Sequence, residues 1–234
     1  MNILEVLQKE KNKPIGALYY YIQTEFAYNS NKIEGSKLTQ SQTRQIFENK
    51  CVYQNNNEPV RVTDIIETNN HFRCVDKIID TANESLSEEY IKEIHKILKT
   101  GTHGFDGNWA EAGEYKRVEN IVGIVETAKP EEVPDKMKKL LQRYNPKALE
   151  DIVEFHARFE SIHPFEDGNG RVGRLIMFKE CLRLGIIPFI ITDINKRYYY
   201  RGLQEWDNGR MYLIGTCLDE QDFTSRVIEK LGYK

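Results

Sequence analysis

The spacing of apolar residues predicts helices along most of the chain. The first stripe, at intervals of three and four, comprises Ile15, Tyr19, Ile22 and Phe26. Similar spacing covers 62–79, 85–98, a stretch from about 134, 147–162 and 170–184, with two or three helices after the stop signal at 185–188. A capping box from Thr39 to Gln42 opens a short helix through Phe47. This pattern predicts an all-α fold.

One stretch departs from the helical pattern. Residues 113–126 are rich in Val, Ile and Tyr, and Glu119 and Asn120 are the candidate turn. We therefore expect a small β-hairpin on the surface of an otherwise helical domain.

Composition narrows the class of protein. The chain has 234 residues, 40% of them hydrophobic, which suffices for the core of one domain. Its 33 Lys and Arg against 36 Asp and Glu favour neither nucleic acid nor an anionic membrane as a partner. The four cysteines stand far apart and no apolar run reaches membrane length, so we expect a soluble, cytoplasmic protein with free thiols.

Candidate chemistry is concentrated in "HPFEDGNGRVGR", residues 163–174. Because Pro164 disfavours the helical conformation before it, one helix should end at His163. Gly168 and Gly170 permit backbone conformations closed to other residues, and the next helix begins near Asn169 with unpaired N–H groups. A helix N-terminus behind such a loop is a ready anion site.

The charged residues of this stretch fit a phosphate site. Arg171 and Arg174 share a face of the first helical turn, where the helix dipole disfavours cations unless an anion lies between them. Asp167 can face the same anion only through a cation, and Mg²⁺ uses one or two carboxylates plus phosphate oxygens. His163 would then be a general base for a hydroxyl that attacks phosphorus. The alternative is a plain polar turn with a structural histidine.

The twelve residues resemble the signature of the Fic family, H-P-F-x-(D/E)-G-N-G-R-x-x-R, at every specified position. The resemblance implies a Fic-like helical domain and transfer of AMP from ATP to a hydroxyl side chain of a protein. In that scheme His163 is the base and Asp167 holds Mg²⁺. Gly168, Asn169 and Gly170 form the anion hole, and Arg171 and Arg174 hold the outer phosphates. The unmodified "GNG" favours nucleotidyl over phosphoryl transfer.

The predicted hairpin resembles the flap of Fic domains, which holds a target segment in extended form by main-chain pairing. The implied flap residues are Tyr115, Lys116, Val118, Ile121 and Val122, with Lys116 where arginine is more frequent. Tyr198 and Tyr199, in an aromatic stretch, are candidates for the adenine pocket. Four other histidines, His71, His95, His103 and His156, are expected to be structural or exposed, and Glu166 is expected to face solvent.

The first long helix ends in "SNKIEG", residues 30–35. Its apolar face turns polar at Ser30 and Glu34 before a helix stop at Gly35, and a carboxylate there is costly unless it is paired. The segment resembles the inhibitory motif (S/T)-x-x-x-E-(G/N) of Fic proteins, which implies that Glu34 pairs with Arg174 and displaces the γ-phosphate of ATP. A frayed helix end with Glu34 in water is the alternative.

Three segments follow from this interpretation: 1–59 with an inhibitory helix at about 14–35, a Fic core at 60–205, and C-terminal helices at 206–234 packed on it. The leading hypothesis is an autoinhibited, Mg²⁺-dependent protein adenylyltransferase that modifies a hydroxyl-bearing protein, including itself when released. Removal of AMP from a modified protein and a non-catalytic nucleotide- or protein-binding module remain alternatives. Self-association into a homo-oligomer is left open.

Overall fold

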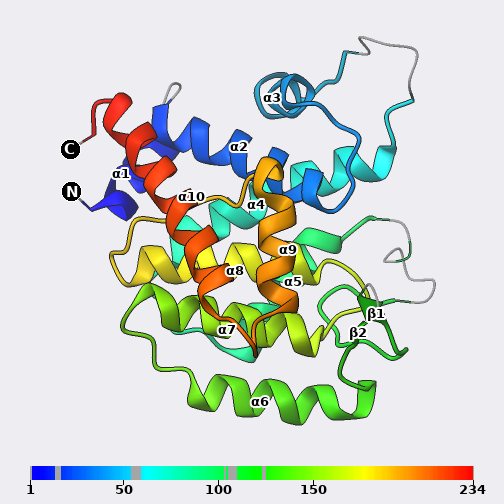
Figure 1. Ribbon diagram of the computed structural model, residues 1–234. Coiled ribbons are helices and arrows are strands. Elements are labelled where there is room, and N and C mark those ends of the chain that lie inside the picture. Colours follow the sequence, from blue (N-terminus) through cyan, green and yellow to red (C-terminus); the bar gives the residue numbers. More distant parts are fainter. Residues whose placement is uncertain are drawn as a thin grey trace.

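The computed structural model describes residues 2–13, 17–53, 59–102, 104, 110–122 and 125–233, so Ile15 and His103 lie outside it. Ten α-helices and a two-stranded hairpin occupy these ranges (Figure 1), which confirms the all-α prediction. In chain order they are α1 (Ile3–Lys11), α2 (Ala17–Ile33), α3 (Gln40–Asn49), α4 (Val62–Thr81), α5 (Glu88–Lys99), β1 (Ile121–Val122), β2 (Val125–Glu126), α6 (Val133–Arg143), α7 (Leu149–Ile162), α8 (Asn169–Arg183), α9 (Lys196–Gln204) and α10 (Met211–Lys230).

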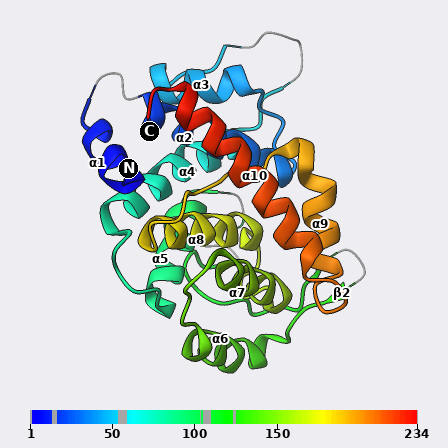
Figure 2. The same ribbon diagram turned by 60° about the vertical axis from the view of Figure 1, so that its left-hand side comes forward.

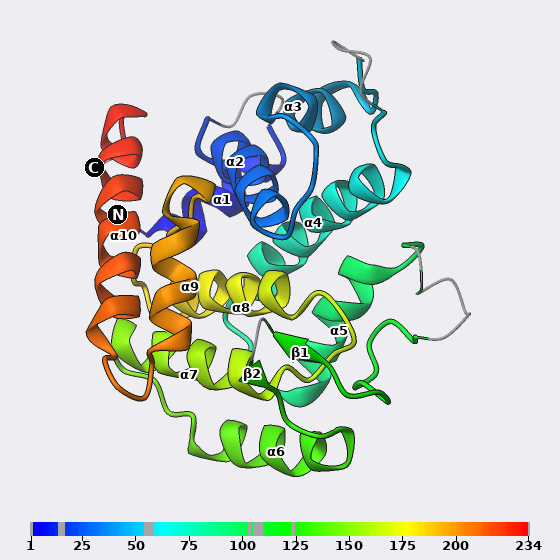
Figure 3. The ribbon, with the colours of Figure 1, turned by 45° about the vertical axis from the view of Figure 1, so that its right-hand side comes forward.

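Helix α8 is the centre of the fold. It crosses the middle of the molecule, with α6 and α7 on one side and α2 and α4 on the other (Figures 1, 2 and 3). All its residues from Arg171 to Leu182 are buried, so it has no single polar face. Phe178 of α8 packs against Phe26 of α2 with ring centroids 5.1 Å apart. The chain that follows the HPFEDGNGR loop is therefore held from all sides, which fixes the loop itself.

Local sequence signals explain most helix starts. The Thr39 capping box is confirmed, since Thr39 Oγ1 accepts from the Gln42 N–H and the Gln42 side chain accepts from the Thr39 N–H. Helix α5 is capped by Ser87, whose Oγ accepts from Tyr90 N at 3.1 Å. Helix α1 was not predicted, because its three buried apolar residues span less than two turns. Asn2 caps it and Leu7 is fully buried.

The end of α2 is tied to α9 and closed by a glycine. Gly35 has a φ of 89°, the left-handed conformation that terminates a helix, and the Ser36 N–H reaches back to Asn31 O at 3.0 Å. Lys196 and Tyr200 of α9 both donate to the carbonyl of Ile33. The structure thus places the residue after α2, Glu34, at a defined point near α8.

The turn of the hairpin was predicted at the wrong residues. Antiparallel pairing of Ile121 with Glu126 and of Val122 with Val125 puts the turn after Val122 rather than at Glu119 and Asn120. Asn120 instead anchors the base of the hairpin. Its side chain accepts from Lys116 Nζ at 2.6 Å and donates to Phe165 O at 3.0 Å, and these tertiary bonds are invisible to a local turn rule.

Within the described ranges, no helix combines the length and the apolar content of a membrane span.

Candidate active site

His163 lies where α7 ends, as the following proline predicts. Its backbone is left-handed, with a φ of 52°, which is uncommon for a residue other than glycine and typical of functional positions. The side chain is 18% exposed. Burial and the nearby charge of Lys116 lower the pKa of His163 to about 4. The imidazole is therefore neutral at neutral pH, the state that a general base requires.

The loop after His163 is braced from within. Asn169 Oδ1 accepts from Phe165 N and Asn169 Nδ2 donates to Phe165 O, both at 2.8 Å. Phe165 is fully buried and stacks on the ring of His95 with centroids 3.8 Å apart. The Asn169 side chain thus shapes the loop, which leaves its backbone N–H as the group it offers to an anion.

His95 links this loop to the hairpin segment. The Gly113 N–H donates to His95 Nδ1 at 2.9 Å, so the proton sits on Nε2, which donates to Asp167 O at 3.0 Å. The pKa of His95 is lowered to about 3 by burial, which keeps this neutral form. The expectation of a structural histidine is confirmed, but its position under the loop after His163 could not be predicted from spacing.

Two glycines make room for an anionic group at the N-terminus of α8, and the Glu34 carboxylate occupies it. Gly168, with a φ of 85°, precedes the helix in the left-handed conformation. A Cβ at Gly170 would collide with the Glu34 carboxylate and come within 2.9 Å of Arg174 Nη1. Glu34 therefore lies directly over the first turn of α8, where unpaired N–H groups favour negative charge.

Arg174 holds Glu34 and is itself held by neutral groups. Its Nη2 donates to Glu34 Oε1 at 2.7 Å and to Ser30 O at 3.0 Å, and its Nε donates to Ser30 Oγ at 3.1 Å. Tyr199 accepts from Nη1 at 3.4 Å. Burial opposes ionisation of Glu34, but Arg174 and Arg171 outweigh it and lower the pKa of Glu34. The predicted pairing of Glu34 with Arg174 is present, and the frayed-end alternative is excluded.

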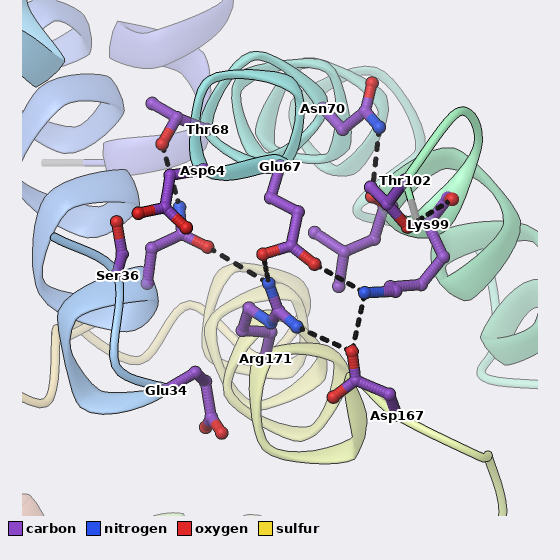
Figure 4. A network of polar contacts seen from close by, with 12 residues as sticks. Glu34, Ser36, Asp64, Glu67, Thr68, Asn70, Lys99, Thr102, Asp167 and Arg171 are labelled. Atoms are coloured by element: carbon purple, nitrogen blue, oxygen red, sulfur yellow. Dashed lines mark hydrogen bonds and ion pairs between the residues drawn. The ribbon is translucent and has the colours of Figure 1, made fainter. Parts of the chain in front are cut away.

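Arg171 faces the other way, into a group of charges that sequence reasoning missed (Figure 4). It forms an ion pair with Glu67 of α4, and its Nη2 lies 3.3 Å from Asp167 Oδ2. Lys99, the last residue of α5, contacts the same Asp167 oxygen at 2.6 Å and also pairs with Glu67. Burial opposes ionisation of Asp167, but Arg171 and Lys99 depress its pKa far below the usual range, so it is a carboxylate.

The site suits a metal–nucleotide complex better than a free ion. In the part of the chain that the structure describes, no group of three or more His, Cys, Asp or Glu side chains is placed to hold a metal. Asp167 alone is available, with a side chain 53% exposed. One carboxylate plus phosphate oxygens is a usual ligand set for Mg²⁺, so Asp167 fits that ion when phosphate is present.

A second buried polar cluster lies behind Arg174. Tyr199 is only 1% exposed, and its hydroxyl is 2.8 Å from His156 Nε2. A Cβ at Gly173 would come within 2.7 Å of both His156 and Glu160, so these residues need a glycine on α8. Burial raises the pKa of Glu160 to about 8. Tyr199 thus supports Arg174, and Tyr198 is 47% exposed; the adenine contacts expected of both stay predictions.

The flap segment docks on the loop through its backbone. The Lys116 N–H donates to Pro164 O at 2.9 Å, and the Lys116 side chain is buried. The Arg117 N–H donates to the Glu166 carboxylate at 2.8 Å, a bond that spacing did not predict, and Glu166 is half-buried with this bond at the exposed surface. Tyr115 packs against Phe165, and Val118 is exposed. Ile121 and Val122 supply β1, whose pairing with a target strand stays a prediction.

Known proteins share the sequence that builds this site. Residues 85–181 match the model of the Fic/DOC family. Residues 85–181 are therefore a Fic/DOC domain. Relatives of the chain include protein adenylyltransferase Fic of Nematostella vectensis, 30% identical over 189 residues that cover 78% of this chain and 43% of that protein. Protein adenylyltransferase fic-1 of Caenorhabditis elegans is 25% identical over 189 residues, covering 76% and 35% respectively. The chain spans less than half the length of these two curated relatives.

Solved structures of Fic proteins share the fold over the whole chain. A Fic domain containing signaling protein from Bacteroides thetaiotaomicron superposes with a TM-score of 0.78 at 24% identity, covering 100% of this chain and 98% of that one. Fic-1 from Caenorhabditis elegans gives 0.73 at 20% identity, covering 98% and 71%. The Fic-like helical architecture is thereby confirmed, from α1 to α10.

Proposed function

We propose that this Fic domain is a protein adenylyltransferase that transfers AMP from ATP to a hydroxyl side chain of a protein, and that Glu34 restrains it. The observation that carries the proposal is the carboxylate of Glu34 on the anion-binding end of α8, paired with Arg174. A neutral His163 stands before the same helix. Relatives that carry the name protein adenylyltransferase support the choice of reaction.

The residues of the chain would act as follows. His163 takes the proton of the target hydroxyl while the hydroxyl oxygen attacks the α-phosphorus of ATP. The bond from that phosphorus to the bridging oxygen breaks, and pyrophosphate leaves. The first N–H groups of α8, at Asn169 and Gly170, bind phosphate oxygens, and Arg174 binds the terminal phosphate. Mg²⁺, held by Asp167 together with phosphate oxygens, would neutralise phosphate charge when bound.

Restraint follows from competition for one position. Glu34 and a terminal phosphate are both anions that need Arg174, so ATP binds poorly or with its α-phosphate displaced while Glu34 is in place. A displaced α-phosphate loses in-line attack, and a misplacement of about 1 Å costs about 10²-fold in rate. Arg174 keeps Ser30 and Tyr199 as partners when Glu34 leaves, so its guanidinium stays oriented for phosphate.

The target would align along the flap. Segment 113–122 is docked on the motif loop by its backbone, and an extended peptide beside β1 would bring a hydroxyl toward His163. The chain itself is a candidate target.

The four cysteines are all free thiols, which is consistent with the cytoplasm as its compartment.

Intact mass after incubation with ATP and Mg²⁺ tests the proposal. Glu34→Gly should gain one or more AMP groups, the wild type far fewer, and Glu34→Gly/His163→Ala none. Glu34→Gln is the matched variant that removes charge and keeps length, and it should also be released. Equal modification of wild type and Glu34→Gly would contradict the restraint, and modification of the double variant would contradict the role of His163. If no variant gains mass although ATP binds, a binding module or AMP removal becomes the better description.

A further inference from the structure

Two charged residues from outside the motif lie against its metal-binding carboxylate. Glu67 of α4 and Lys99 of α5 complete a closed ring with Arg171 and Asp167 (Figure 4). Positive and negative groups alternate around this four-residue ring, which we call the charge ring. The side chains of Lys99 and Arg171 are 2% and 3% exposed, and that of Glu67 is 11% exposed. Asp167, at 53%, is the one member that is largely exposed.

The ring creates a difficulty for Asp167 as a metal ligand. Lys99 Nζ at 2.6 Å and Arg171 Nη2 at 3.3 Å both contact its Oδ2. A carboxylate that two full cations share is a weak ligand for a third cation, because each of them already draws on its charge. A further negative charge must offset these two cations if Asp167 is to bind Mg²⁺.

Glu67 is placed to do so. Its Oε1 contacts Lys99 and its Oε2 contacts Arg171, one oxygen for each cation. The two positive charges of the ring therefore face two carboxylates, and the formal charge of the four groups is zero. Without the charge of Glu67, Lys99 and Arg171 would both have Asp167 as the remaining carboxylate of the ring.

We propose that Glu67 is a positioning residue for the divalent cation: it neutralises Lys99 and Arg171 and so leaves Asp167 free to bind metal–nucleotide. This inference rests on the proposed function, since it concerns the same cation. It predicts that two substitutions in the charge ring change the effect of metal on nucleotide binding in opposite directions. Glu67→Gln should weaken the effect of metal on nucleotide binding, and Lys99→Met should strengthen it.

A purely structural role for the ring predicts something else. If Glu67 and Lys99 only fasten α4 to α5, each substitution would lower stability, and neither would raise metal dependence. Lys77 and Glu93 offer the matched control. Their ion pair, with Lys77 Nζ 2.8 Å from Glu93 Oε1, joins the same two helices but does not involve the motif, and their side chains are 28% and 48% exposed. Glu93→Gln removes one negative charge and one α4–α5 ion pair, as Glu67→Gln does.

The experiment measures ATP affinity by calorimetry with Mn²⁺ and with EDTA, in a Glu34→Gly/His163→Ala background that prevents turnover. The ratio of the two affinities is the metal enhancement. We expect Glu67→Gln to reduce this ratio about 10-fold, the lower range for loss of an outer-shell partner. Glu93→Gln should leave it unchanged, Lys99→Met should increase it, and Glu67→Gln/Lys99→Met should return it toward the background value.

The outcomes separate this inference from the proposed function. If the background binds no ATP under either condition, the proposed function fails first. If it binds ATP with metal enhancement and Glu67→Gln keeps that enhancement, the inference alone is wrong. A decrease in Lys99→Met would also overturn it, and that variant decides the matter should Glu67→Gln fail to fold, as thermal melting would show.

Discussion

Arg171 and Arg174 stand one turn apart on α8, yet their surroundings differ. On the α4 and α5 side, Arg171 is enclosed by Glu67 and Lys99, which come from helices of the core (Figure 4). On the α2 and α9 side, Arg174 has Glu34, a residue just beyond the end of α2 with a side chain 28% exposed. The charge of Arg171 is balanced within the charge ring, whereas that of Arg174 is paired with a carboxylate that gives way to phosphate in the proposed function. Identical residues on one helix thus have different partners, and the proposal for Glu34 gives a switch to Arg174 alone.

Removing Arg171 should have the largest effect on stability. Arg171→Met leaves Glu67 and Asp167 with one cation between them, and breaking a buried ion pair by removing one partner costs about 3–5 kcal/mol. Glu34→Gln, on the other side, should cost about 1 kcal/mol or less, because Arg174 keeps Ser30 and Tyr199. Denaturant unfolding measures both free energies. Equal losses of unfolding free energy in Arg171→Met and Glu34→Gln would contradict the difference between the surroundings of Arg171 and Arg174.

Glu160, behind Arg174, should make stability depend on pH. Its folded-state pKa of about 8 is above its unfolded value of 4.5, so the folded state holds a proton that the unfolded state releases between these values. The wild type should therefore lose stability relative to Glu160→Gln as pH rises from about 4.5 to about 8, on the order of a few kcal/mol in total.

Melting curves of wild type and Glu160→Gln across this pH range provide the test. Glu150→Gln, an exposed position on the same helix, is the control and should follow the wild type. A constant difference in melting temperature between wild type and Glu160→Gln would mean that Glu160 is not protonated in the folded protein.

Ser30→Ala should have a smaller effect and should act on Arg174 alone. It removes the hydroxyl that accepts from Arg174 Nε at 3.1 Å and leaves a buried charged donor unpaired, at a cost of about 1.5–3 kcal/mol. The same change should loosen the orientation of Arg174 and weaken ATP binding in the Glu34→Gly background. Calorimetry checks the second effect, and unchanged ATP affinity would show that Ser30 serves only the helix.

The smallest effect expected concerns the base itself. Because burial lowers the pKa of His163 to about 4, the imidazole is already neutral well below neutral pH. Transfer by Glu34→Gly should therefore change little from about pH 5.5 to about pH 8 through this group, with loss only as pH approaches about 4. Initial rates of self-modification over this range test the prediction. A fall in rate with a midpoint near pH 6.5 would show that His163 is not buried during turnover.

Sequence patterns predicted the parts of the site that are close in the chain. Pro164 and the glycines placed His163 at a helix end and α8 after a loop, since these residues restrict or free the backbone wherever they occur. The pairing of Glu34 with Arg174 came from a family motif, and no spacing rule links residues 140 positions apart. Asn120 was misassigned, and the bond of Glu166 to the Arg117 N–H was missed, because their partners are backbone groups of distant loops.

The sequence by itself determined the helical fold, the anion-binding loop and the chemistry available at His163, Asp167 and the two arginines. These depend on apolar periodicity and on backbone preferences that act over a few residues. Only the tertiary structure decided that Arg171 pairs with Glu67 and Arg174 with Glu34. Glu67 and Lys99 reach α8 from α4 and α5, and Glu34 reaches it from the turn after α2; charges act through distance in space rather than separation along the chain.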